Sequence, residues 1–126
     1  MAPISLGELI DKISILNIKL EHVSDPAQHK NILTERDELM AILSQFEFHN
    51  DSELARLTVE ITDINKKMWR LEDDIRNFID INKYDEDYIE VAKDIPYTND
   101  RRCEVKKEIN LKFNSHIIEE KLYQRK

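Results

Sequence analysis

The stretch that decides the fold is Leu54–Phe78, which reads LARLTVEITDINKKMWRLEDDIRNF. Apolar side chains recur in it at every third or fourth position, namely Leu54, Leu57, Ile61, Ile64, Met68, Leu71, Ile75 and Phe78. This spacing places all eight side chains on one side of an α-helix. We therefore predict a helix over about residues 52–81, which at 1.5 Å per residue is roughly 45 Å long.

Two shorter segments with helical apolar spacing precede this stretch. Ser5 and Glu8 have the spacing of a capping box, in which the hydroxyl and the carboxylate each accept a backbone N–H at the start of a helix. Asp25 followed by Pro26 has the pattern of an N-cap and a first helical residue. For the long third helix, Asn50 is the expected cap because Glu53 follows three residues later.

The C-terminal part of the chain predicts two shorter helices. A fourth helix starts at Asp85 and ends at about Asp94, because the residue before Pro96 is disfavoured in the helical conformation. Asn99 is then expected to cap a fifth helix. Residues 115–126 have a weaker pattern, and we leave this arm unassigned.

The expected architecture is all-α. An antiparallel hairpin of the first two helices packs on the long third helix, and two shorter C-terminal helices fold back. The length of 126 residues allows one domain with one core. Because the third helix is longer than the hairpin, its overhang must be covered by the C-terminal helices or by a second copy. We therefore predict a homodimer.

Composition excludes several classes of partner. The chain has 26 acidic and 19 basic side chains, a formal charge of −7, which disfavours nucleic acid and anionic lipid. No stretch is apolar and long enough for a membrane span or a signal peptide. The only cysteine, Cys103, indicates a reducing compartment, so we expect a cytoplasmic protein. The only glycine, Gly7, rules out glycine-rich phosphate-binding loops.

One acidic pattern suggests an enzyme. Glu35 and Glu38 are three residues apart on the second predicted helix, and Glu60 and Asp63 repeat this spacing on the third. Four converging carboxylates would hold magnesium ions that bind a polyphosphate. The spacing resembles the acid pairs of the MazG-type all-α nucleoside triphosphate pyrophosphatases. However, Asp63 lies roughly 120° from the apolar side of its helix, so we keep this as the alternative interpretation.

Two polar constellations form the candidate binding surface. The first comprises Asn65, Trp69, Glu72 and Arg76, and the second comprises Asn99, Asp100 and Arg102. The functional interpretation is that they line a cleft. The structural interpretation is that Glu72 and Arg76 form an ordinary ion pair, that Trp69 widens the buried face and that Asn99 caps a helix. We expect no catalytic residue among them.

Several segments together resemble a known family. They are PISLGELIDKISILNIK at residues 3–19, Asn65 with Trp69, Glu72, Asp73 and Arg76, the pattern Tyr97-x-Asn99-Asp100-x-Arg102, and the closing Ile109-Asn110, Asn114-Ser115 and Glu120-Lys121 pairs. They are similar to a family of short bacterial and phage proteins whose function is unknown, so the resemblance implies no activity. It includes both polar constellations and not the four acids, which favours a single polar surface. Our leading hypothesis is a non-enzymatic helical module that self-associates and binds a partner protein or a small polar ligand.

Overall fold

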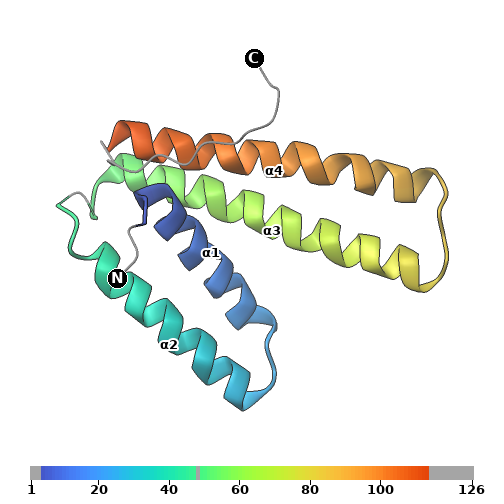
Figure 1. Cartoon of the computed structure of the whole chain (residues 1–126), viewed down its shortest axis with the longest axis horizontal. Coiled ribbons are helices and arrows are strands. Elements are labelled where there is room, and N and C mark those ends of the chain that lie inside the picture. Colours follow the sequence, from blue (N-terminus) through green and yellow to red (C-terminus); the bar gives the residue numbers. More distant parts are fainter. Residues whose placement is uncertain (1–3, 48, 114–126) are drawn as a thin grey trace.

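A computed structural model describes residues 4–47 and 49–113 of the chain (Figure 1). Its elements are α1 (Leu6–His22), α2 (Pro26–Leu43), α3 (Ser52–Asp80) and α4 (Glu86–Lys112). The described residues contain no strand, so the predicted all-α class is confirmed over them. In the same residues, each helix is too short or too polar to span a bilayer. The unassigned arm at 115–126 lies outside the described residues.

Ser5 and Asp25 are the N-caps of the first two helices, as predicted, but the Glu8 carboxylate, expected to complete the capping box, contacts Lys106. The Ser5 hydroxyl accepts the Glu8 N–H at 3.2 Å, and the Asp25 carboxylate accepts the N–H three residues later at 3.0 Å. The expected cap of α3 was wrong by one residue. Asp51, not Asn50, is the N-cap, and its Oδ1 accepts two backbone N–H groups at 2.8 and 3.2 Å. A carboxylate at this position also interacts favourably with the helix dipole.

The two predicted C-terminal helices are in fact one helix. Pro96 lies inside α4, and Asn99 is an interior residue of that helix and not its cap. A proline removes one backbone hydrogen bond and disfavours the helical conformation of the residue before it. Here α4 packs on α3 on both sides of the proline, through Tyr88 before it and Arg101 after it. Packing along the whole of α3 therefore outweighs the local signal to stop.

Helix α1 is the centre of the fold. Its backbone lies close to those of α2, α3 and α4, whereas the backbone of α2 lies close to that of α1 and not to those of α3 or α4. Helices α3 and α4 form a long antiparallel hairpin, and α1 crosses the end of this hairpin where α3 begins and α4 ends (Figure 1). Correspondingly, α2 has no buried residue. The predicted hairpin of α1 and α2 thus approaches α3 through α1.

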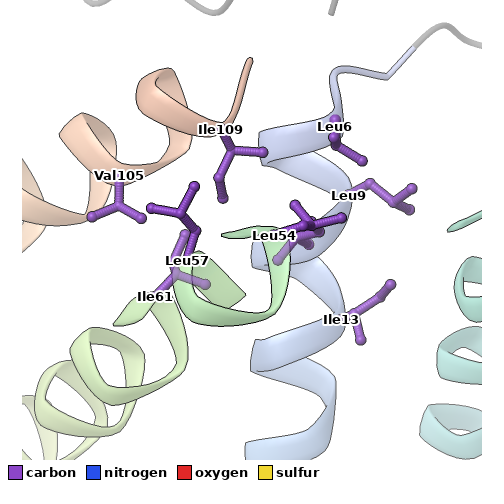
Figure 2. Close-up of a cluster of buried hydrophobic side chains, with 9 residues drawn as sticks. Leu6, Leu9, Ile13, Leu54, Leu57, Ile61, Val105 and Ile109 are labelled. Atoms are coloured by element: carbon purple, nitrogen blue, oxygen red, sulfur yellow. The ribbon is translucent and has the colours of Figure 1, made fainter. Parts of the chain in front are cut away.

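The apolar core lies at this crossing (Figure 2). Its buried side chains are Leu6, Leu9, Ile10, Ile13, Leu54, Leu57, Ile61, Val105 and Ile109. They come from α1, from the first half of α3 and from the second half of α4, so the core joins segments that are more than a hundred residues apart in sequence.

The other end of the α3–α4 hairpin has no such core. We call residues 72–97 the distal hairpin and the remaining described residues the body. Not one residue of the distal hairpin is buried. Asn82, with φ 54°, provides the left-handed conformation that the turn between the two helices requires. Helix α1 ends at His22, and the distal hairpin extends past it (Figure 1).

Candidate functional site

A buried carboxylate on α1 organises the polar residues of the body. The Asp11 side chain is 0% exposed, although carboxylates are almost never fully buried without a partner. Arg102 on α4 donates from Nε to Asp11 Oδ1 at 2.9 Å and from Nη2 to Asp11 Oδ2 at 2.5 Å. This two-point geometry is the strongest arrangement for a guanidinium and a carboxylate. It ties α1 directly to α4.

The same carboxylate binds α3. The Asn65 amide donates one hydrogen to Asp11 Oδ1 at 2.9 Å and the other to Ser14 Oγ at 2.6 Å. Ser14 in turn donates to the backbone carbonyl of Asp11 at 2.8 Å. All three side chains are at least 95% buried, so the interactions take place away from water.

A second ion pair continues this arrangement toward the end of α4. Lys106 Nζ lies 2.5 Å from Glu8 Oε2 and 3.9 Å from Asp11 Oδ2, and its side chain is buried. Two cations thus balance two carboxylates. We call this set the polar seam; it comprises Glu8, Asp11, Ser14, Asn65, Arg102 and Lys106.

The polar seam is electrostatically complete. Within the described residues, no buried side-chain nitrogen or oxygen lacks a hydrogen-bond partner. The hydrogen bonds that Arg102 donates to Asp11 raise the pKa of Arg102 above its usual value, so this guanidinium stays charged. Buried charges that are fully paired fix how the helices that carry them pack together. Removing one of them leaves its partner buried without a counter-charge.

The only glycine lies at the closest approach of two helices. The Gly7 N–H donates to Asn110 Oδ1 at 2.7 Å. A Cβ atom at Gly7 would lie 2.4 Å from the carbonyl oxygen of Lys106, which is part of the α4 backbone. A larger residue would therefore push α1 away from α4, so the role of Gly7 is close packing.

The structure places the predicted polar residues as follows. Asn65 and Arg102 converge on Asp11, and Asn99 Oδ1 accepts a long hydrogen bond of 3.4 Å from Arg102. The Trp69 ring stacks on His22 with centroids 4.7 Å apart. These four residues thus lie along α1, and Asp100 is a half-buried neighbour of Asn99.

The remaining two residues lie elsewhere. Glu72 and Arg76 are exposed and belong to the distal hairpin. Arg76 contacts Asp73 at 2.6 Å, so the expected Glu72–Arg76 ion pair is replaced by a pair with a different carboxylate. The seven candidate residues are therefore divided between the two parts of the molecule.

The four acids of the pyrophosphatase alternative are not brought together. Glu35 and Glu38 lie on α2, whose backbone does not lie close to that of α3. Glu60 on α3 is paired with Arg101 and also lies 3.5 Å from Arg56. Among residues 4–47 and 49–113, no group of three or more His, Cys, Asp or Glu side chains is placed to hold a metal ion.

Sequence reasoning missed the residue at the centre of the seam. Gly7, Asp11 and Ser14 are spaced by four and three residues, which places them on one side of α1. A strip of small and polar residues beside the apolar stripe of a helix is a signal of close helix packing with buried polar contacts. This signal was present, but it does not reveal which residues on α3 and α4 complete the contacts.

Comparison with known proteins identifies the family. The chain belongs to the family described as Family of unknown function (DUF6165), which matches residues 1–126. The expected membership of a family without a known function is thus confirmed. No curated protein and no solved structure matches the chain.

Proposed function

We propose that this member of the DUF6165 family is a non-enzymatic helical interaction module. The body is the scaffold, and the distal hairpin is the arm through which two copies associate. The observation that carries this proposal is a set of large apolar side chains on the distal hairpin that are 46 to 69% exposed. They are Ile79, Ile81, Tyr84, Ile89 and Tyr97.

The exposure has a simple structural cause. An amphipathic helix must bury its apolar stripe against other elements, and in the body α1 supplies the third helix. The distal hairpin has two helices. Its inner contacts include the edge-to-face pairs of Tyr88 with Phe78 and with Tyr84. Among residues 4–47 and 49–113, no element covers its outer apolar side chains, and exposed apolar patches mark interaction sites.

A second copy is the partner that best fits this arm. Two identical hairpins related by a twofold axis bring four helices together, an arrangement that encloses an apolar core. This arrangement would cover the apolar side chains of α3 at Ile75 and Phe78, which are half-buried in one copy. It is the homodimer that the length of α3 predicts.

Charge makes the association sensitive to salt. The distal hairpin has nine acidic and three basic side chains, a formal charge of −6 out of −7 for the whole chain. Two such arms repel each other at low ionic strength. Salt reduces the Debye length from about 10 Å at 0.1 M to about 3 Å at 1 M, so the dimer should become tighter as salt is added.

The hydrogen bonds within the polar seam favour a structural role for its residues over ligand binding. Asn65 and Arg102 are already hydrogen-bonded to Asp11, and Asn99 to Arg102. A small polar ligand would have to break these contacts to use them. This favours a protein partner over a small polar ligand.

Sedimentation velocity at micromolar concentration tests the proposal. We expect the unmodified chain to dimerise and to do so more strongly in about 1 M than in about 0.1 M salt. The double variant Ile81→Ser, Ile89→Ser should be monomeric. Val59→Ser is the matched control, since Val59 is an exposed apolar residue of α3 within the body, and it should still dimerise. A monomeric parent chain at both salt concentrations would overturn the proposal.

A further inference from the structure

A groove separates α2 from α3 on the side of the body away from α4. Its volume is about 330 Å³, within the range of small-molecule sites. Helix α1 forms its floor, and α2 and α3, whose backbones do not lie close to each other, form its walls. The apolar side chains that line it include Ile10, Ile13, Met40, Leu43 and Leu54.

The groove wall has no charged side chain. Charged residues make up 36% of the chain, yet no Asp, Glu, Lys or Arg is among the residues that line the groove. Its two threonines bond to the backbone of their own helix. Thr58 donates to the carbonyl of Leu54 at 2.7 Å, and Thr62 donates to that of Thr58 at 2.7 Å. The wall therefore offers mainly hydrocarbon contact, and its other polar side chains are Ser14, Asn17 and His49.

A cation lies at the edge of this uncharged wall. Asn17, which lines the groove, accepts a hydrogen bond at 3.0 Å from Arg36 Nη1 on α2. The Arg36 side chain is partly exposed, and its ion pair with Asp37 is on the surface, where such pairs contribute little. An anionic group could therefore replace Asp37 at low cost.

We propose that this groove binds an aliphatic chain with a carboxylate head, that is, a ligand of the fatty-acid class. The chain lies along Ile10, Ile13 and Met40, and the carboxylate pairs with Arg36. Charge complementarity supports this ligand at both ends, because the wall is uncharged and its edge is cationic. The site is separate from the distal hairpin, so the proposal does not depend on dimerisation.

Binding of decanoate, decanol and decylammonium tests this assignment, with each compound kept below its micelle-forming concentration. Methyl NMR of the full chain reports where each compound binds. We expect decanoate to perturb the Ile10, Ile13, Met40 and Leu54 methyl groups and to bind more tightly than decanol, with decylammonium the weakest.

Two variants separate the tail from the head of the ligand. Met40→Glu places a charge in the wall and should weaken decanoate binding by about tenfold or more. Arg36→Gln should remove the preference for decanoate over decanol and leave decanol binding unchanged. Val59→Glu is the matched control on a neighbouring exposed position, and it should bind like the parent chain.

Three results would overturn the proposal. The first is no perturbation of these methyl groups by decanoate. The second is equal binding of all three compounds, which indicates an adventitious additive only. The third is perturbation confined to methyl groups outside the groove, such as those of the distal hairpin. Circular dichroism of each variant verifies that the helices are retained, so that a loss of binding can be distinguished from unfolding of the chain.

Discussion

The body and the distal hairpin share two helices but differ in the burial of their side chains and in their formal charge. All described buried residues lie in the body, whereas residues 72–97 contain none. The distal hairpin also carries a formal charge of −6 out of −7. The difference arises because α1 ends at His22, so the third helix that completes the body is missing from the distal end. The buried core and the proposed dimer surface therefore lie at opposite ends of one pair of helices.

The largest effect that this comparison predicts is at Asp11. Asp11→Ala leaves Arg102 and Lys106 near the junction without their central carboxylate. Removing one partner of a buried pair costs about 3–5 kcal/mol, so we expect a loss of this size in the free energy of unfolding. Urea denaturation followed by circular dichroism measures it.

The matched control for Asp11 is a carboxylate of the distal hairpin. Asp73→Ala breaks the exposed pair with Arg76 and should change the free energy of unfolding by less than about 0.5 kcal/mol. Equal effects of the two substitutions would show that the seam is not the structural junction we describe. If Asp11→Ala fails to fold, Asp11→Asn, which keeps the shape and removes the charge, gives the same ordering.

A smaller effect is expected at Gly7. Gly7→Ala places a methyl group against the α4 backbone and forces α1 and α4 apart. Overpacking of this kind costs about 1–3 kcal/mol, even though alanine is the better helix former. Thermal unfolding measures the loss. Asn77→Ala, on an exposed face of the distal hairpin, should be neutral or slightly stabilising; an unchanged midpoint for Gly7→Ala would contradict the close approach.

The smallest effect concerns pH. Hydrogen bonds from Arg56 and then from Lys112 lower the pKa of Glu53 from 4.5 to about 2. The unfolded chain therefore binds this proton more readily than the folded chain does. The contribution of Glu53 is complete above about pH 4.5 and is lost as the pH falls toward 2.

Unfolding midpoints measured from about pH 5 down to about pH 2 test this linkage. Glu53→Gln should lower stability slightly at the upper end and make the decline toward acid less steep. Asp73→Asn in the distal hairpin is the control and should leave the acid dependence of the body unchanged. A Glu53→Gln curve parallel to that of the parent chain would contradict the assignment.

Much of the fold was predictable because the signals for single helices are local. Apolar spacing of three and four residues identified α3, and the side chains of Ser5 and Asp25 marked the starts of α1 and α2. Local signals failed where packing opposed them. Pro96 and Asn99 indicated a break, yet α4 continues through both because it packs on α3 along its length.

The sequence by itself determined the helical class, the two N-terminal helix starts, the length of α3 and the membership of both polar constellations in one family resemblance. The tertiary structure alone decided that Asn65 and Arg102 meet at Asp11, that α2 stays away from α3, and that the distal hairpin lacks a third helix. The physical reason is the separation in sequence over which each interaction acts. Capping and apolar spacing act within a few residues, whereas Asp11 and Arg102 are 91 residues apart and meet as a result of how the whole chain packs.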